Sequence, residues 1–245
     1  MPPRKRIVVA GAAVALVGLV VLFPARVAYH WFTPPGVALS GIEGSVWRGR
    51  ALHASMAGLY AGNLRWRIAP LSLLSGKLAY RIEAAPAGGF IDGSVGVGFG
   101  GDLHVSGLSA SLPLAAVESF AGIRGIRGMA NSRIERLRIA DGTPVAADGS
   151  VEVADLAVPM IAPFSIGGYR AEFFTEEDGI VASVEDTDGI VDLAGRLLLS
   201  PDRSYQFLGQ LAPKPDTPER IREQMKFLGT ANARGQYELR LEGSL

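Results

Sequence analysis

The sequence predicts a mainly β protein, with a single N-terminal transmembrane helix followed by an antiparallel, curved or groove-like β-sheet domain with one or two short helices. Three observations support this fold class. Residues 7–23 carry no polar or charged side chain, apolar and polar residues alternate beyond residue 36, and Asp-Gly pairs recur between the alternating runs. An uninterrupted apolar run is typical of a membrane helix, whereas two-residue alternation and Asp-Gly turns are typical of antiparallel strands.

Composition excludes several classes of protein. The 245 residues contain 24 Lys and Arg against 24 Asp and Glu, so the formal charge is zero. A neutral chain lacks the positive field that holds nucleic acid, and we expect no nucleic-acid partner. Cysteine is absent, which excludes disulfides, cysteine-ligated zinc and thiol catalysis. The 31 glycines and 15 prolines disfavour a helical bundle, because both residue types destabilise helices.

The N-terminus has the charge pattern of a membrane anchor. Arg4, Lys5 and Arg6 precede the seventeen-residue apolar run, which would form a helix of roughly 26 Å, near the short end of what spans a bilayer. Trp31 lies where an interfacial aromatic residue is expected. By the positive-inside rule we expect a cytoplasmic tip at 1–6, a transmembrane helix at 7–25, a juxtamembrane linker at 26–36 and a β-rich domain at 37–245 across the membrane.

A cleaved signal peptide is the alternative interpretation of this segment, because it has the same basic start and apolar run. Cleavage after Ala28 would put Arg26 at the −3 position, where small residues are required, and bulky aromatic residues follow. The pattern therefore favours a retained anchor.

One face of the predicted anchor is made of small residues. Gly11, Ala15 and Gly18 follow one another at helical spacing, and such a stripe allows a second helix to approach closely. We interpret it as a helix-packing face, although small residues are common in membrane helices in any case.

The remainder of the chain reads as strands joined by tight turns. In residues 63–68, Leu64, Trp66 and Ile68 alternate with polar residues, and residues 77–83 and 236–242 repeat the pattern. Further strands are expected at 94–99, 102–109, 131–140, 145–156, 169–175, 180–186, 190–199 and 204–211. Asp-Gly pairs at 92–93, 141–142, 148–149, 178–179 and 188–189 predict tight hairpins, and consecutive hairpins make a meander.

One helix is expected in the exported region. Residues 216–219, Asp-Thr-Pro-Glu, are typical of a helix start, and Gly229 is typical of a stop. Ile221, Met225 and Leu228 form an apolar stripe at helical spacing, which predicts that the helix packs against one end of the sheet. Weaker helical turns are expected at 114–120 and 70–74.

Motifs for catalysis or cofactor binding do not have the context that they require. Gly96, Gly98 and Gly101 have the spacing of a dinucleotide loop, but a strand follows them instead of a helix, so we expect a hairpin. The three histidines are far apart, the acidic residues near 176–178 and 185–192 lack the order of a calcium loop, and no serine lies in an acyl-transfer motif. We therefore expect no catalytic, metal or cofactor-binding residues.

Two tryptophans and two arginines are the candidate partner contacts. Trp47 and Trp66 are large anchors of the kind that interfaces use, and Arg65 and Arg67 flank Trp66 on the polar side of its strand. The alternative interpretation is that both tryptophans fill the core. The positive charge of the two arginines is compatible with contact to an acidic partner.

The order of these features resembles the type II secretion system protein N family, also called general secretion pathway protein N, of Gram-negative bacteria. The similarity covers nearly the whole chain, beginning with the basic tip and apolar run. Its further segments are residues 44–49, 64–67, 70–78, 205–209, 227–229 and 235–239. The resemblance implies an inner-membrane protein with a periplasmic β-rich domain that belongs to the machinery exporting folded proteins, and it does not imply catalysis.

Two functions follow as expectations. The first is a non-enzymatic, inner-membrane-anchored periplasmic component that assists assembly or stability of the secretion machinery by binding other subunits. The alternative is a membrane-tethered β-groove that binds or carries lipid acyl chains, which predicts an open trough lined by Leu, Val, Ile and Phe. Neither function requires a cofactor.

Overall fold

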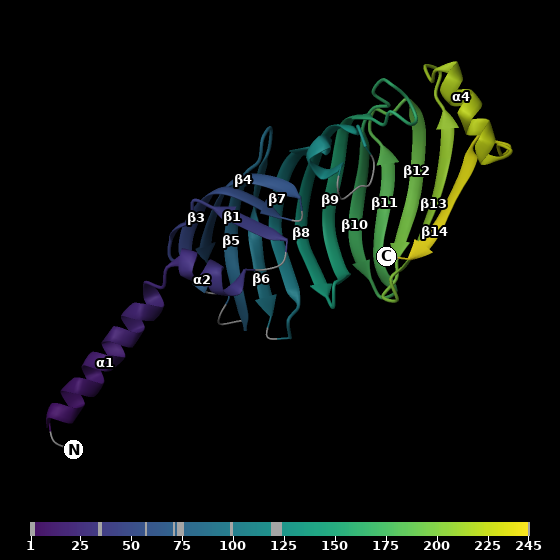
Figure 1. The fold of residues 1–245 in the computed structure, drawn as a ribbon. Coiled ribbons are helices and arrows are strands. Elements are labelled where there is room, and N and C mark those ends of the chain that lie inside the picture. Colours follow the sequence, from purple (N-terminus) through teal and green to yellow (C-terminus); the bar gives the residue numbers. More distant parts are fainter. Residues whose placement is uncertain are drawn as a thin grey trace.

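A single antiparallel meander makes up most of the protein (Figure 1). The computed structural model describes residues 3–33, 36–56, 58–70, 72, 76–98, 100–118 and 124–244. Within these residues, fourteen strands form one sheet in which nearly all neighbours in space are neighbours in sequence, except that β1 and β2 both pair with β3. The predicted meander is confirmed.

The strands and helices have the following bounds. The strands are β1 (Val37–Ser40), β2 (Glu43–Gly44), β3 (Arg48–Met56), β4 (Leu59–Ile68), β5 (Lys77–Ala85), β6 (Phe90–Gly98), β7 (Leu103–Pro113), β8 (Arg127–Ala140), β9 (Thr143–Ala157), β10 (Tyr169–Glu176), β11 (Gly179–Asp186), β12 (Val191–Leu199), β13 (Ser204–Pro213) and β14 (Tyr237–Ser244). The helices are α1 (Pro3–Val21), α2 (Ala25–Phe32), η2 (Leu114–Val117), α4 (Glu219–Met225) and η3 (Lys226–Leu228).

The sheet separates apolar from polar side chains because neighbouring residues of a strand point to opposite faces. Over five neighbouring strands, β5 to β9, the residues that pair across strands fall into rows that are either mostly apolar or mostly polar. One row on what we call the apolar face is Tyr80, Val95, Val105, Leu137 and Ala147. The adjacent row on the polar face is Arg81, Ser94, Ser106, Arg136 and Asp148.

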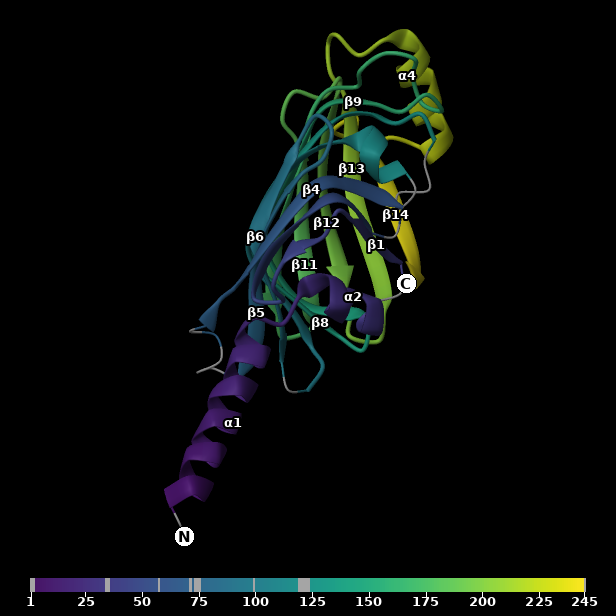
Figure 2. The same cartoon turned by 60° about the vertical axis from the view of Figure 1, so that its left-hand side comes forward.

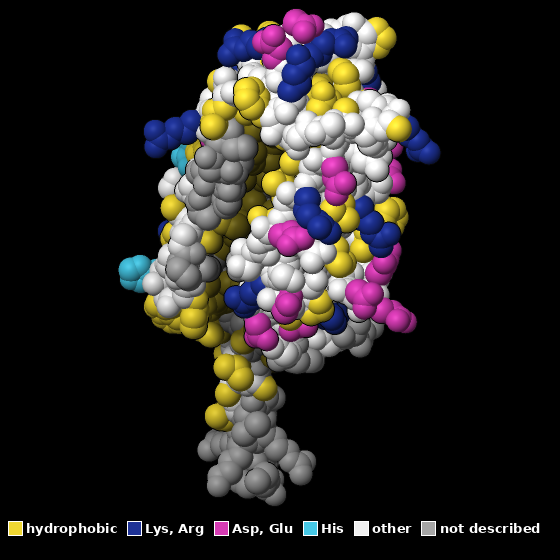
Figure 3. All heavy atoms as spheres, turned by 90° about the vertical axis from the view of Figure 1, so that its right-hand side faces the viewer, with side chains coloured by type: hydrophobic (Ala, Val, Ile, Leu, Met, Phe, Trp, Pro, Cys, Tyr) yellow, Lys and Arg dark blue, Asp and Glu magenta, His cyan; other side chains and the backbone are white. Residues whose placement is uncertain are grey.

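The sheet is curved and remains open. Figure 2 shows it curling so that the edge strands β1 and β14 lie on the same side of the molecule. Figure 3 shows a hollow lined by hydrophobic side chains, so the apolar face is the concave one. The mainly β, curved antiparallel sheet with few helices is confirmed.

The buried core lies at one end of the sheet. Ile221 and Met225 of α4 are each 5% exposed, and they pack with residues of η2, β12 and the connections around them. The other buried members of this cluster are Leu114, Ile126, Val158, Ala162, Ile166 and Val191. Leu228, the third residue of the predicted stripe, is 41% exposed. Helix α4 begins at Glu219 without a side-chain cap. The predicted helix is therefore present, but the capped start expected at residues 216–219 is not.

The N-terminal segment contains two helices. α1 covers most of the apolar run, and α2 occupies most of residues 26–36, where a linker is expected. None of the helices within the described ranges combines the length and apolarity that crossing a bilayer requires. The membrane span at 7–25 stays a prediction.

Two of the five predicted Asp-Gly hairpins are wrong. Asp92 and Gly93 lie inside β6, and Asp148 and Gly149 lie inside β9. The register shifts opposite both pairs, and the extra residue lies on the partner strand, at 107–108 in β7 and at Glu135 in β8, so each Asp-Gly pair lies in the regular strand opposite a β-bulge. By contrast, the Asp141-Gly142 turn between β8 and β9 has positive φ at both residues, as a tight hairpin requires. The expected turn at 70–74 falls largely outside the described residues.

Candidate docking face on the first strands

Arginines are concentrated on the polar face of β3, β4 and β5. In one row Arg50 is opposite Arg65, which is opposite Glu83. In the next row Arg48 is opposite Arg67, which is opposite Arg81. Like charges placed directly opposite each other destabilise a sheet. The protein therefore maintains this cluster, the arginine face, at a cost in stability.

Among the described residues, ion pairs neutralise only two of the five arginines of this face. Arg50 pairs with Glu43 at 2.6 Å, and Arg81 pairs with Asp92 at 2.8 Å. None of the ion pairs formed among the described residues includes Arg48, Arg65 or Arg67. All three are exposed, so their guanidinium groups are available to an anionic partner.

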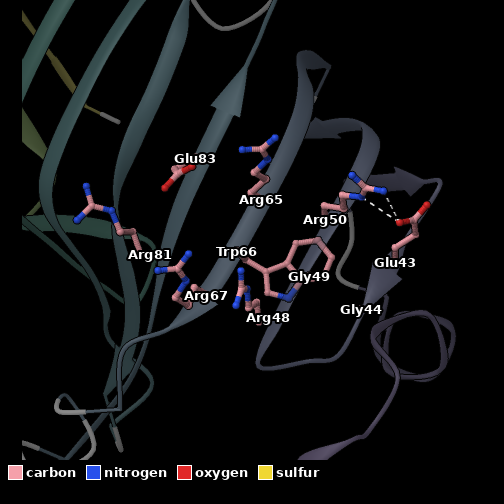
Figure 4. A pocket seen from close by; sticks show the side chains of 10 residues that line it. All are labelled: Glu43, Gly44, Arg48, Gly49, Arg50, Arg65, Trp66, Arg67, Arg81 and Glu83. Carbon is pink, nitrogen blue, oxygen red and sulfur yellow. Dashed lines mark hydrogen bonds and ion pairs between the residues drawn. The ribbon is translucent and has the colours of Figure 1, made fainter.

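A cavity of about 400 Å³ lies over this face. Figure 4 shows the five arginines around it, with Glu83 beside Arg65 and Glu43 at the far edge. Each guanidinium offers planar, forked donors that match a carboxylate or phosphate. The chemistry of the cavity is thus recognition of an anion, and its open shape suits a surface segment of another molecule.

Trp66 supports the arginine face from the other side of β4. Because side chains alternate, it points away from Arg65 and Arg67, and its ring lies across Gly49 (Figure 4). The indole Nε1 donates to the carbonyl oxygens of Ser45 and Val46, each at 3.2 Å. Trp66 therefore fixes the β2–β3 turn. Its ring packs against Gly49 of the neighbouring strand, so its role here is structural.

Trp47 connects the sheet to the first helix. Its Nε1 donates to the carbonyl oxygen of Val20 at 2.8 Å, and the Val46 amide donates to Phe23 at 3.0 Å. The Val20 carbonyl at the end of α1 thus gains a second donor beside the Phe23 amide at 3.3 Å, and the Phe23 carbonyl just beyond the helix is satisfied as well. The structure thus brings Arg65 and Arg67 together, and assigns Trp47 to the junction with α1.

The other residues singled out from the sequence lie in the N-terminal helices. Arg4, Lys5 and Arg6 belong to α1, but their side chains lie outside the described ones. Along α1, no other atom would come within 4 Å of a Cβ added at Gly11 or Gly18, and Ala15 is exposed. Trp31 of α2 is 64% exposed, with its ring 5.7 Å from that of Phe23.

Groups with perturbed pKa values lie at the end of the sheet that α4 covers. The Asp186 carboxylate is bonded to the Lys214 ammonium and accepts a hydrogen bond from the Leu193 amide at 2.8 Å. Burial opposes ionisation of Asp186, but these bonds outweigh it and lower its pKa. Burial, followed by the charges of Asp186 and Asp188, raises the pKa of Tyr169 to about 12. The bonds of Asp186 join the ends of β11 and β12 to the segment after β13.

The glycine-rich segment at 96–101 and His53 have structural roles in their hairpins. Gly101 has positive φ in the β6–β7 hairpin, where the Gly98 amide donates to Asp102 at 2.9 Å. His53 Nδ1 lies 2.8 Å from the Tyr60 hydroxyl. Among the residues that the structure describes, no three His, Asp or Glu side chains are grouped as a metal ion would require.

Sequence reasoning missed Arg48, Arg50 and Arg81 as parts of the site. A signal exists, since 48/50 and 65/67 are arginine pairs with the spacing of one strand face. Recognising the cluster also requires knowing that β3, β4 and β5 are neighbours in a particular register.

Comparison with known proteins gives a consistent result. A profile of the family described as "Type II secretion system (T2SS), protein N" matches residues 35–240. The Type II secretion system protein N of Vibrio cholerae serotype O1 is 27% identical over 243 residues, covering 96% of each chain. The protein of the same name from Aeromonas hydrophila is 26% identical over 254 residues, covering 99% of each chain. No solved structure matches the chain significantly.

Proposed function

The chain belongs to the type II secretion system protein N family, and on that premise we propose that it is a non-enzymatic, inner-membrane-anchored component whose periplasmic sheet assists assembly or stability of the secretion machinery. The arginine face is the surface through which it binds another subunit. The anchor is residues 7–25, with the tip at 1–6 in the cytoplasm and residues 37–245 in the periplasm.

The character of α1 supports the anchor. Leu16 is 64% exposed and Leu19 is 63% exposed, and residues 7–23 contain no polar side chain. Apolar side chains on a projecting helix are unfavourable in water and favourable in the hydrocarbon core of a bilayer. The three cations before the run favour a cytoplasmic N-terminus.

The junction with α1 supports a membrane-proximal position for the arginine face. The hydrogen bonds from Trp47 to Val20 and from Val46 to Phe23 join the end of α1 to the segment that leads into β3. Figure 1 shows the first strands beside α2, and α4 at the other end of the sheet. A partner held in the same membrane would meet these first strands.

The observation that carries the proposal is the set of unpaired arginines on adjacent strands. Arg48 is opposite Arg67 and Arg50 is opposite Arg65 across β3 and β4, and an acidic segment would relieve the repulsion within these pairs. Complementary charge also steers association and selects partners. We therefore expect the docked subunit to present aspartate or glutamate side chains to this face.

The test replaces Arg65 and Arg67 with glutamate in the full-length chain and measures secretion in cells that lack the wild-type gene. We expect the Arg65→Glu, Arg67→Glu variant to lose most secretion and to lose co-purification of other secretion subunits, because two attractive charges become repulsive. The chain itself should remain at its normal level in the membrane fraction.

The matched control is the Arg133→Glu, Arg138→Glu variant. Both residues lie exposed on β8, on the same polar face, and neither takes part in the ion pairs of the described residues. The control changes net charge equally but leaves the arginine face intact, so secretion should continue. Equal secretion by the two variants would argue against the proposed docking face.

A further inference from the structure

The apolar face continues without interruption beyond the strands that the buried core covers. A second row of this face comprises Val151, Ala171 and Val184 on β9, β10 and β11. A third comprises Leu197, Phe207 and Leu241 on β12, β13 and β14. Such a face normally packs against helices or a second sheet.

Among the described residues, no second layer covers most of this face. Leu78, Val97 and Leu241 of the apolar rows are all exposed. Within the described part of the chain, no large side chain is fully buried, and the apolar residues at or below 1% exposure are alanines. An extended apolar surface left in contact with water marks a binding site for something apolar.

Near α4 the trough deepens into a cavity of about 540 Å³. The size and apolar lining are those of a ligand pocket. Of the described residues that line it, Gln224 alone has an amide side chain, and the Tyr169 hydroxyl is already bonded to the Ile166 carbonyl at 3.2 Å. The hollow visible in Figure 3 is likewise lined with hydrophobic side chains and opens to the outside.

The chemistry of the trough excludes several occupants. An extended peptide would bring backbone N–H and C=O groups that need partners, whereas the strands beneath the trough already pair with their neighbours. A second copy of the chain cannot bind through its own concave face, because two concave faces do not fill each other. A hydrocarbon chain is narrow and flexible, and it requires no hydrogen bonds.

We propose that the concave apolar face binds an acyl chain of a phospholipid taken from the membrane in which the protein is anchored. The proposal rests on the anchoring given above, which keeps the open trough close to a bilayer. It goes beyond subunit binding, because the apolar and arginine faces are opposite sides of the same strands.

The test uses the full-length chain reconstituted in phosphatidylethanolamine and phosphatidylglycerol vesicles that contain a trace of phospholipid with a diazirine in its acyl chain. After irradiation, labelled peptides are identified by mass spectrometry. We expect labels on α1 and on trough residues such as Val184, Leu193 and Leu211. A parallel sample receives a free fatty acid with the same diazirine, and it should label the trough less than the phospholipid does.

Matched variants distinguish the two faces of one strand. Val184 lies in the cavity, whereas the neighbouring Ser183 is exposed on the polar face. We expect Val184→Glu to lower the trough label by roughly tenfold or more, because the acyl chain would bury a charge, and Ser183→Glu to leave it unchanged. Val184→Trp, which keeps the face apolar but fills the hollow, should lower the label as well.

The outcomes separate this inference from the proposed function. Label on α1 without label in the trough would overturn acyl binding and leave the anchor standing. Label in neither segment would contradict both. Equal trough labelling of the Val184 and Ser183 variants would also overturn the inference, because the adducts would then not depend on the concave face.

Discussion

Gly49 is the residue on which the shape of the arginine face depends most closely. A Cβ at this position would lie 2.4 Å from the Trp66 ring and 2.6 Å from the Glu43 carbonyl oxygen. In Gly49→Ala the indole must move, and its hydrogen bonds to Ser45 and Val46 must lengthen. We expect the free energy of unfolding to fall by about 1–3 kcal/mol, the usual cost of overpacking, as measured by urea denaturation.

Gly98→Ala provides the control at the same scale. The nearest atom to a Cβ there is His104 Nε2, at 3.4 Å, which is an ordinary contact, so the free energy of unfolding should change little. A similar loss in both variants would show that the Trp66 contact is not the cause.

Individual residues of the arginine face differ in whether the sequence predicts them. Arg65 and Arg67 are predictable because they flank Trp66, whereas Arg81 belongs to the site only through strand register.

Among the elements, β11 and the segment before α4 are joined by one ion pair. Asp186 ends β11 with its side chain 8% exposed, and Lys214 lies just after β13 with its side chain 31% exposed. The hydrogen bond from Lys214 lowers the pKa of Asp186 despite burial, and the bond to Asp186 raises the pKa of Lys214. The pair therefore stabilises the fold only while both groups are charged.

The direction of each shift defines the pH range. A lowered Asp186 pKa gives stability that is present above about pH 3.9, the ordinary aspartate value, and is lost as pH falls through the folded value. A raised Lys214 pKa gives stability that is present below about pH 10.4 and is lost as pH rises through the folded value. The contribution is thus largest between these limits.

Lys214→Met tests this connection. It leaves Asp186 buried without its main partner, so we expect the free energy of unfolding at pH 7 to fall by about 1–3 kcal/mol. The difference from wild type should shrink as pH falls below about 4, because Asp186 is then becoming protonated in both proteins. Arg240→Met is the control, because Arg240 forms an exposed pair with Glu242, and it should lower the free energy of unfolding by less than about 1 kcal/mol. Urea denaturation across this pH range measures both variants. A pH-independent difference would rule out the ion pair as the cause.

Periodicity predicted most elements because it depends on neighbouring residues alone. The alternating runs correspond to β4 to β14 within a few residues. The Asp-Gly pairs at 92–93 and 148–149 form no turn because both lie inside strands, each opposite a β-bulge of its partner strand, and the dipeptide alone does not reveal that pairing. Helix α4 followed from its apolar stripe, whereas α2 was not predicted, since eight residues after a proline are too few for a clear helical period.

For the whole molecule, the central feature is one sheet with two chemically distinct faces. Alternation predicted one covered face and one wet face. The two faces separate as predicted, but the described residues bury the apolar face only at the end near α4. Which end of the trough is closed could not be predicted, because Ile221 and Met225 meet Leu114 across a long stretch of sequence. The arginine face likewise exists only because three consecutive strands, β3 to β5, align their polar residues.

Photo-crosslinking in living cells tests the central claim, that the arginine face binds another secretion subunit, most directly. A photoreactive amino acid is placed at position 65 on β4 or, as the control, at position 138 on β8, and crosslinked proteins are identified by mass spectrometry. We predict that position 65 captures one subunit of the secretion machinery, that Arg67→Glu reduces the yield, and that position 138 does not capture it. Capture of no subunit at position 65, or equal capture at both positions, would contradict the claim.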